Sequence, residues 1–421
     1  MGVLAWGTLA VAVVLVLVAV HDLVQTRHSI LRNFPLVGHL RFVLESFGPE
    51  LRQYIVAADD DEGPFTRDER SWIYATAKGD NPYQGFGTDN VITRDGYLVL
   101  LHAAFPHPET AGDEGPHHLP FARPLGDAHG RPGAFTPASF VNISAMSFGS
   151  LSGRAVEALN RAAAAAGCLH NTGEGGISPH HLHGGELVYQ VGTGYFGCRD
   201  PEGRFDLDRL CATVASGPVR AVEIKLSQGA KPGLGGVLPG VKVTPEIAAA
   251  RGVPVGVTVH SPNHHRAFDD VAGLVAFVER IADATGLPVG IKSAVGEAAF
   301  WDELFAHMAA TGRGPDFVTV DGGEGGTGAG PLSFTDHVAL PLRDALALVA
   351  AARRRHGLDA TVALIASGRL GLAHNAVAAA ALGADGVNVA REAMFAIGCI
   401  QAQRCHNGHC PTGVATQNRW L

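Results

Sequence analysis

The stretch PVGIKSAVGEAAFWDELFAHMAATGRGPDFVTVD, residues 288 to 321, decides the fold of this 421-residue chain. It begins and ends with short apolar runs rich in β-branched residues, and an alanine-rich segment lies between them. Strand, helix and strand in this order form the βαβ unit of a parallel sheet. The same alternation recurs between residues 141 and 390, which predicts a sheet built by repeating this unit.

The alternation contains eight strand candidates. They are VNISAM (141–146), CLHN (168–171), AVEIKL (221–226), PVGVTVH (254–260), PVGIKS (288–293), DFVTVD (316–321), TVALIAS (361–367) and GVNVA (386–390). Amphipathic helical stretches, such as 269–285 and 338–355, separate most of them. Eight such units predict an α/β fold of the (β/α)8 TIM-barrel type. A doubly wound open sheet is the alternative.

The predicted barrel places its chemistry at the carboxyl ends of the strands. The segments that follow the candidates are MSFGS, NTGEGG, KLSQGAKPGLGG, HSPNHH, KSAVGE, DGGEGGTGAG, SGRLG and AREA. Loop exposure explains polarity in general, but it does not explain lysines directly at two strand ends, Lys225 and Lys292. We therefore expect the active site at this end of the barrel.

Two of these segments predict a phosphate-bearing cofactor. SGRLG (367–371) and AREA (390–393) follow the seventh and eighth strands, where such barrels bind phosphate through backbone N–H groups and helix amino termini. Gly368 permits close backbone approach, and Arg369 and Arg391 supply positive charge. The glycines of DGGEGGTGAG (321–330) leave room for a flat ring against the backbone; a flexible loop is the alternative reading.

Charged residues at the strand ends predict anion binding. Lys292 leaves an apolar strand and needs an anion, either a flavin ring that becomes negative on reduction or a carboxylate of Glu297 or Glu324. Lys225 and Lys231 flank Gln228, which suits the binding of substrate carboxylates. Glu174 in NTGEGG is placed to orient a substrate nitrogen or to balance these lysines.

Three of the six cysteines lie close together near the end of the chain. Cys399, Cys405 and Cys410 in GCIQAQRCHNGHCPTGVATQ have the spacing C-x5-C-x4-C. This spacing suits a three-iron cluster, or a zinc site completed by His406 or His409. The absence of CxxC pairs argues against a zinc ribbon, and three unrelated buried cysteines are the remaining alternative. Cys168, Cys198 and Cys211 show no such spacing.

The amino terminus predicts a membrane anchor. VLAWGTLAVAVVLVLVAV (3–20) carries no charge, lacks the basic start and small-x-small cleavage site of a signal peptide, and is about long enough to span a bilayer. Arg27, Arg32 and Arg41 follow it, which favours a single-pass inner-membrane protein with a cytoplasmic catalytic domain. A buried core helix is the alternative. The formal net charge of −8 excludes a nucleic-acid-binding protein, which needs a basic face.

We therefore expect three parts: a transmembrane anchor (1–24), a linker and barrel-covering irregular α+β segment (25–140), and the barrel with its cysteine motif (141–421).

The segment from about 141 to 417 resembles the FMN-binding synthase domain of glutamate synthases, and more narrowly the stand-alone, membrane-anchored members of that family. The matching stretches, in order, are SAMSFGSLS, NTGEGGISP, EIKLSQGAKPGLGGVLPGVKV, HSPNHH, DGGEGGTGAGP and GCIQAQRCHNGHCPTGVATQ. The third and the last are highly specific.

The resemblance implies FMN at the open end of the barrel and a [3Fe–4S] cluster on Cys399, Cys405 and Cys410. Electrons from ferredoxin or an NAD(P)H-dependent reductase reach FMN, which reduces the imine of 2-oxoglutarate and ammonia to L-glutamate. The residues implied around the flavin are Met146, Ser147, Asn171, Lys292, Gly323, Gly368, Arg369 and Arg391. Those implied on the catalytic, 2-oxoglutarate side are Lys292, Glu174, Gln228 and Lys231.

Two departures from the family pattern shape the expectations. Full glutamate synthases begin with a glutaminase domain whose nucleophile is an amino-terminal cysteine, whereas the first cysteine here is Cys168. The chain ends four residues after Gln417, so a carboxyl-terminal truncation that removes the last barrel helix is also expected. The alternatives are a flavin barrel acting on another 2-oxo acid or imine, a flavin barrel of another reaction type, and a non-catalytic membrane-bound electron relay.

Overall fold

The computed structural model describes residues 2–56, 58–81, 83, 85–105 and 119–420. The chain divides into two compact units, Met1–Asp68 and Glu69–Leu421. The boundary at residue 68 lies well before residue 141, where the regular alternation of strands and helices begins.

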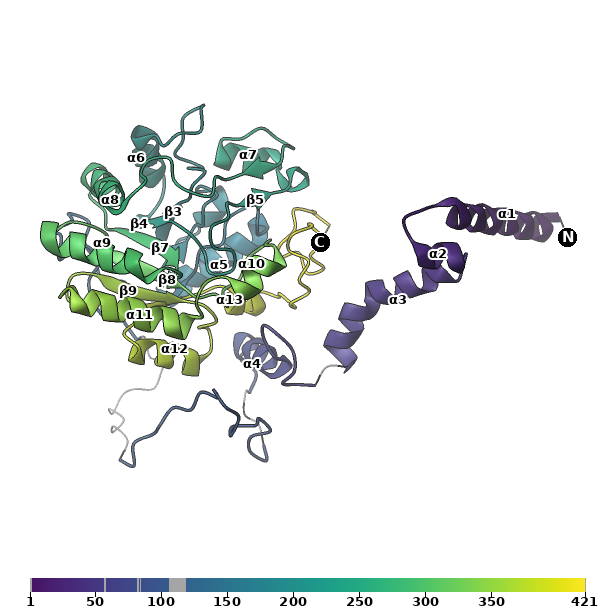
Figure 1. Cartoon of the computed structure of the whole chain (residues 1–421), viewed down its shortest axis with the longest axis horizontal. Helices are drawn as coiled ribbons and strands as arrows, with labels where there is room; N and C mark the ends of the chain where they lie inside the picture. The colour runs from purple at the N-terminus through teal and green to yellow at the C-terminus, as the bar shows by residue number, and fades with distance from the viewer. Residues whose placement is uncertain (1, 57, 82, 84, 106–118, 421) are drawn as a thin grey trace. The chain divides into compact units, whose positions relative to one another are not determined.

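The first unit is helical. It comprises α1 (Gly2–Val24), α2 (Ser29–Asn33), α3 (Gly38–Leu51) and the π-helix η1 (Arg52–Val56) (Figure 1). Asp22 near the end of α1 is fully buried, and its carboxylate accepts hydrogen bonds from the backbone N–H of Leu36 at 3.0 Å and from His39 Nε2 at 2.9 Å. These bonds fix the turn between α1 and α3. Residues Ala5–Val24 are long and apolar enough to cross a membrane, a test that a signal sequence also passes.

The second unit contains a closed barrel of eight parallel strands in the order β1-β10-β9-β8-β7-β4-β3-β2. The strands are β1 (Val141–Ile143), β2 (His170–Asn171), β3 (Leu187–Val191), β4 (Val219–Lys225), β7 (Val289–Ala294), β8 (Phe317–Asp321), β9 (Ala363–Ser367) and β10 (Gly386–Val389). The predicted (β/α)8 TIM barrel is therefore confirmed, and the doubly wound sheet is wrong.

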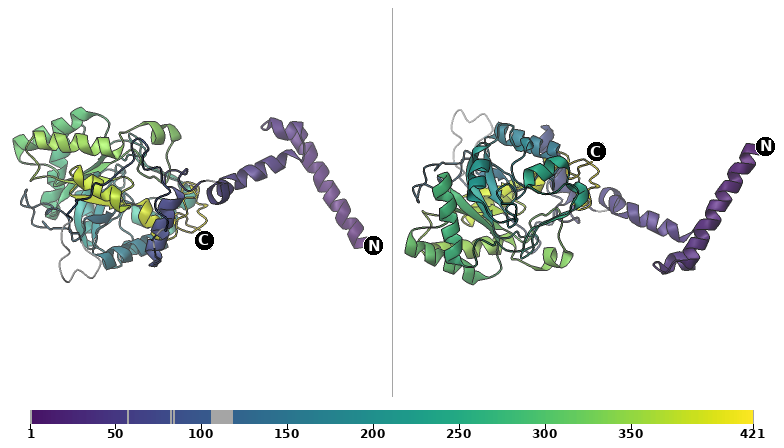
Figure 2. Two further views of the ribbon diagram at one scale, coloured as in Figure 1. Left: turned by 90° about the horizontal axis from the view of Figure 1, so that it is seen from below. Right: turned by 90° about the horizontal axis from the view of Figure 1, so that it is seen from above.

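Helices follow most of the strands and surround the sheet (Figures 1 and 2). In chain order they are α4 (Arg67–Lys78), α5 (Gly153–Ala166), the 3-10 helix η2 (Pro179–His181), α6 (Leu207–Ala215), the 3-10 helix η3 (Gly240–Lys242), α7 (Pro245–Arg251), α8 (Val271–Thr285), α9 (Ala298–Thr311), α10 (Leu332–His337), α11 (Leu342–Arg355), α12 (Ala373–Ala381) and α13 (Arg391–Ala396). Capping sets their ends: Asp270 accepts a bond from Gly273 N–H at the start of α8, and Gly286 with φ 69° ends it.

One predicted strand is wrong and another was missed. In 254–260 only β6 (Val259–His260) is extended, and it pairs with β5 (Val237–Leu238) in a separate antiparallel sheet. Gly256 has φ 72°, and Val255 and Val257 are exposed, so this run lacks the extended backbone and the burial of a barrel strand. The missing barrel strand is β3, whose residues are all buried. Its sequence, LVYQV, is short and bounded by glycine, so periodicity did not identify it.

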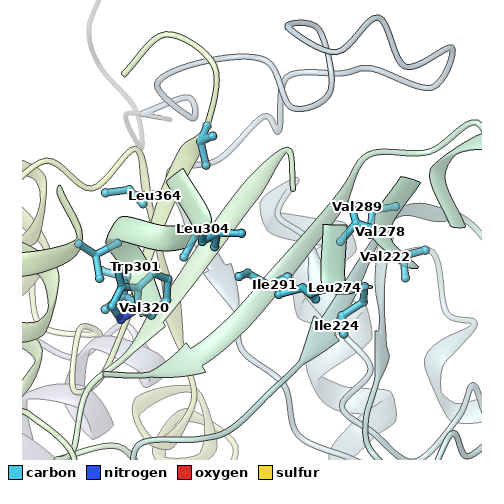
Figure 3. Packing of buried hydrophobic residues seen from close by; sticks show 14 of the residues in the cluster. Val222, Ile224, Leu274, Val278, Val289, Ile291, Trp301, Leu304, Val320 and Leu364 are labelled. Carbon is cyan, nitrogen blue, oxygen red and sulfur yellow. The ribbon is translucent and has the colours of Figure 1, made fainter. Parts of the chain in front are cut away.

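The main hydrophobic core lies between the outer faces of the strands and the surrounding helices. Figure 3 shows Val222 and Ile224 of β4 and Ile291 of β7 facing the helical layer. Trp301 of α9 and Val278 of α8 are 1% and 0% exposed. Apolar burial on this scale is the main stabilising contribution to the barrel.

A buried ion-pair network attaches residues 119–140 to the end of the barrel where the strands begin. Arg131 donates to both carboxylate oxygens of Glu279 at 2.7 and 2.9 Å and lies 3.3 Å from Asp316. Asp316 also accepts bonds from His129 and from the N–H of Val289. In the described part of 25–140 the expected irregular α+β segment consists of helices and loops with one isolated bridge, Leu125 to Phe135.

We expect Arg131→Met to lower the free energy of unfolding by about 3–5 kcal/mol, because it leaves the buried carboxylate of Glu279 without its cation and removes one partner of Asp316. Urea denaturation of the detergent-solubilised chain, followed by tryptophan fluorescence, measures this change. Arg154→Met is the control: its exposed ion pair with Glu157 predicts a loss below about 1 kcal/mol. Equal losses in both variants contradict the role of the network.

Candidate active site and cysteine loop

The register of the barrel brings charged side chains to one end. Lys225, the last residue of β4, is paired with Lys292 of β7, and Asp321, the last residue of β8, is paired with Ser367 of β9. The carboxyl ends of these adjacent strands therefore present two cations and one anion at nearly one level. These side chains lie at the end of the barrel where the strand-end segments predict an active site.

Glu174, Lys225 and Gln228 form one hydrogen-bonded group. Lys225 Nζ donates to Glu174 Oε1 at 2.8 Å and to Gln228 Oε1 at 2.7 Å. Burial raises the pKa of Glu174, but the charge of Lys225 and its hydrogen bond lower that pKa overall. Burial lowers the pKa of nearby Lys231, and the like charge of Lys225 lowers it further. A side chain at Gly192 would overlap Glu174, so the glycine makes room for this carboxylate.

A fourth cation, Arg251, belongs to this site, and the sequence analysis missed it. It is 4% exposed, and its Nη2 donates to Ser147 Oγ at 3.2 Å and to the carbonyl of Phe148 at 3.1 Å. Its guanidinium lies 5.2 Å from the ring centre of Phe196. In the described ranges no Asp or Glu lies within ion-pair distance of it, and its Nε is buried without a partner. Burial lowers the pKa of Arg251 to about 10, partly offset by the charge of Glu174.

The sequence around Arg251 does not predict a role in the site, because Arg251 is the last residue of the short helix α7. Thr244 caps this helix by accepting a bond from Ile247 N–H, and Pro245 starts it. An arginine at a helix end usually interacts with the helix dipole at the surface. Only the packing of α7 over the barrel turns this side chain inward.

Lys292 pairs with Asp321, and not with Glu297 or Glu324, the carboxylates that the sequence offered as alternatives to a flavin. The Nζ-to-Oδ1 distance is 3.3 Å, and both side chains are buried. Burial lowers the pKa of Lys292, but the nearby carboxylates, Asp321 first, raise it overall. Asp321 Oδ2 also accepts a bond from Gly229 N–H at 2.8 Å, so the loops after β4 and β8 are joined beside Lys292.

Asn171 lies in a polar layer inside the barrel. Its amide donates to Glu223 Oε1 at 2.8 Å and its carbonyl accepts from Gly173 N–H at 3.0 Å. Gln190 and Thr319 also donate to Glu223, at 2.7 and 2.6 Å. Both polar groups of Asn171 are therefore occupied, and the residue fixes the start of the loop that carries Glu174.

The residues expected on the flavin side lie around the strand ends. Met146 is buried in the same apolar cluster as the cysteine motif, and Ser147 binds Arg251. Gly323 N–H donates to the carbonyl of Leu340 at 2.8 Å, so this glycine is held against the loop before α11.

The SGRLG turn (367–371) borders a hollow at the end of β9. Gly368 has φ 145° and Arg369 has φ 52°, so both backbone groups are in the left-handed half of conformational space. Arg369 Nη2 donates to both oxygens of Glu69, at 2.9 and 3.0 Å, and both residues line the hollow with Gly368. Arg391 donates to the carbonyl of Glu324, and burial lowers the pKa of Arg391.

The three cysteines share one apolar cluster beside the mouth. Cys410 is buried, and Cys399 and Cys405 are partly buried. Tyr74 donates its hydroxyl to the carbonyl of Cys399 at 2.7 Å, and Lys242 donates to that of Cys405 at 3.2 Å. In the described part of the chain no three His, Cys, Asp or Glu side chains converge on one metal position. A single zinc ion needs such convergence, so the zinc alternative with His406 or His409 has no support, whereas the ligands of a three-iron cluster bind different iron atoms.

The thiols differ in their surroundings. Burial raises the pKa of Cys399 to about 11 and raises that of Cys405. Burial also opposes ionisation of Cys410, but backbone N–H groups led by that of Ala415, together with Thr412, lower its pKa overall. Hydrogen bonds to sulfur of this kind stabilise the thiolate that binds metal.

The fold and site define a (β/α)8-barrel protein with a cation-rich active-site mouth beside a cysteine loop. A family model described as the conserved region in glutamate synthase matches residues 134–421. The glutamate synthase large subunit-like protein YerD of Bacillus subtilis is 38% identical, across 97% of this chain and 84% of its own length. The chain therefore belongs to the glutamate synthase family.

Other relatives are longer than the region they share. The archaeal-type glutamate synthase [NADPH] of Thermotoga maritima is 37% identical, across 66% of this chain and 52% of its own length. The ferredoxin-dependent glutamate synthase of Cyanidium caldarium is 34% identical, across 66% and 18%. The chain thus spans about half of the archaeal-type relatives. A structure of mandelate oxidase is 18% identical with a TM-score of 0.40, across 64% of this chain and 71% of that one.

Proposed function

We propose that this protein is an FMN- and iron–sulfur-dependent oxidoreductase that reduces the imine of 2-oxoglutarate and ammonia to L-glutamate. The observation that carries the proposal is the charge at the barrel mouth. Lys225, Lys231 and Arg251 surround one carboxylate, Glu174. Buried cations in excess of anions favour a dianionic ligand, and 2-oxoglutarate carries two carboxylates.

Different residues suit the phosphate and the flavin ring of FMN. The backbone at Gly368 and the guanidinium of Arg369 can bind the phosphate of FMN. In this structure the guanidinium of Arg369 donates to the carboxylate of Glu69 instead. Lys292 is a buried, ionised ammonium, which stabilises negative charge on a reduced ring. When bound, FMN supplies the hydride.

The substrate side is assigned from the remaining contacts. Arg251 and Lys231 bind the carboxylates, because neither lies within ion-pair distance of an Asp or Glu in the described part of the chain. Glu174, held by Lys225, orients the N–H groups of the imine. Hydride adds to the imine carbon and a proton to its nitrogen, and we assign that proton to the Glu174–Lys225 pair, the titratable groups of this cluster.

Cys399, Cys405 and Cys410 would hold a [3Fe–4S] cluster, whose chemistry is one-electron transfer. The three thiols in one cluster and the N–H groups around Cys410 fit such ligands. The relatives' names point to two electron donors, NADPH and ferredoxin.

The first unit supports anchoring at the inner membrane, with the barrel on the cytoplasmic side. Most of the large apolar side chains described in α1, Trp6 and Leu17 among them, are exposed. Leu40, Leu44 and Phe47 are also exposed, and their spacing places them on one face of α3. Lipid covers such surfaces at the membrane interface.

The direct experiment is an anaerobic assay of the full chain with 2-oxoglutarate, ammonium and dithionite-reduced ferredoxin. L-Glutamate forms if the proposal holds. Flavin present without glutamate formation indicates the second candidates, another 2-oxo acid or an electron relay.

Substitution of Arg251 tests the carboxylate site. We expect Arg251→Met to weaken 2-oxoglutarate binding at least about tenfold, since a charged hydrogen bond contributes roughly 1.5–3 kcal/mol. Calorimetry on the purified protein measures the affinity. Arg199→Met is the matched control, because Arg199 also lies over the Phe196 ring, at 4.9 Å, but binds the carbonyl of Gly252. Equal losses in both variants contradict the assignment.

Charge placed in α1 tests the anchor. We expect the full chain with an amino-terminal tag to remain in membranes after carbonate washing, with its tag intact. Val14→Arg together with Leu17→Arg costs roughly 2.5–3.5 kcal/mol per arginine at the centre of a span and moves the protein to the soluble fraction. Loss of the tag from the wild-type chain identifies a signal sequence instead.

A further inference from the structure

Lys242 is a buried ammonium that no assigned part of the site uses. It ends the 3-10 helix η3 and is 4% exposed. Its Nζ donates to three carbonyls, those of Ser150 at 3.1 Å, Cys405 at 3.2 Å and Ala415 at 3.2 Å. Three acceptors require three N–H groups, and only the ammonium form of lysine has three. The geometry therefore defines Lys242 as a cation.

This cation lacks a carboxylate partner. In the described ranges no Asp or Glu lies within ion-pair distance of its Nζ, and the other cation that acts on it, Arg251, repels it. A buried charge without an opposite charge is strongly unfavourable, even when carbonyl dipoles surround it. The carbonyl oxygen of Cys405 lies 3.2 Å from its Nζ, so the charge sits beside one of the three cysteines. Burial lowers the pKa of Lys242, and the sulfurs of Cys405 and Cys410 partly offset this shift.

Lys242 also joins three segments that are far apart in the sequence. Ser150 lies in the loop after β1, Cys405 in the cysteine loop and Ala415 in the carboxyl-terminal segment. Gln417 adds a parallel link by donating to the carbonyl of Leu151 at 2.9 Å. The ammonium is thus held in place relative to the cysteines.

We propose that Lys242 is the counter-cation of the iron–sulfur centre: its fixed ammonium offsets the negative charge of the thiolate-bound cluster and raises its reduction potential. The inference rests on the proposed function, because it requires a cluster on Cys399, Cys405 and Cys410. Reduction adds an electron next to a buried positive charge, and this charge stabilises the reduced form. Lys242 is a positioning residue, since it acts through the cluster and touches no substrate.

The test compares anaerobically purified wild-type chain with Lys242→Met, Lys242→Arg and Arg313→Met. Arg313→Met removes one exposed positive charge just before β8, at the opposite end of the barrel. Iron and sulfide content and the cluster potential, from a redox titration followed by electron paramagnetic resonance, are measured for each. We expect Lys242→Met to make reduction at least tenfold less favourable, about 59 mV for one electron. Lys242→Arg and Arg313→Met should remain near the wild-type potential.

Each outcome decides the question. An intact cluster with an unchanged potential in Lys242→Met overturns the inference and leaves the proposed function standing. If Lys242→Met folds, by circular dichroism, but loses iron, retention of iron in Lys242→Arg supports the need for a cation. Equal loss of iron in both variants shows that only the shape of lysine matters and overturns the inference. Wild-type protein without iron overturns the proposed cluster itself.

Discussion

The closure of eight parallel strands is the constraint on which the rest of the structure depends. Closure fixes the register between neighbouring strands, and this register sets Lys225 beside Lys292 and Asp321 beside Ser367. A shift of one residue in β4 would turn Lys225 from the mouth of the barrel to its outer face. The site is therefore a consequence of strand pairing, and the glycine-rich loops fill the space above it.

Buried positive charge is the second organising feature. Lys231, Arg251, Lys242 and Lys292 are each no more than 7% exposed, yet only Lys292 has a carboxylate within ion-pair distance among the described residues. A protein without ligands would be more stable with apolar side chains at such positions. The cations are explained if anions bind there: substrate carboxylates at Arg251 and Lys231, and a sulfur-ligated cluster at Lys242.

Much of this could be predicted from the sequence, because strand–helix alternation and strand-end polarity are local patterns. The barrel and the cluster of Glu174, Lys225 and Gln228 follow from them, and the closeness of the three cysteines follows from their short spacing in the sequence. Arg251, Lys242 and the Lys292–Asp321 pair could not, since they depend on which way a helix or loop packs over the barrel. The sequence predicts residues 254–260 as a barrel strand in place of β3 for the same reason. Both runs are rich in valine, and only the burial of β3 in the folded chain distinguishes them.

The proposed reaction requires a flavin at the barrel mouth next to a sulfur-bound iron cluster. The most direct measurement is the absorption spectrum of the anaerobically purified full chain, with flavin and iron quantified in the same sample. The proposed function predicts one FMN and about three iron atoms per chain, with flavin bands above a broad iron–sulfur absorption. A colourless protein, or one that contains zinc in place of iron, would contradict it.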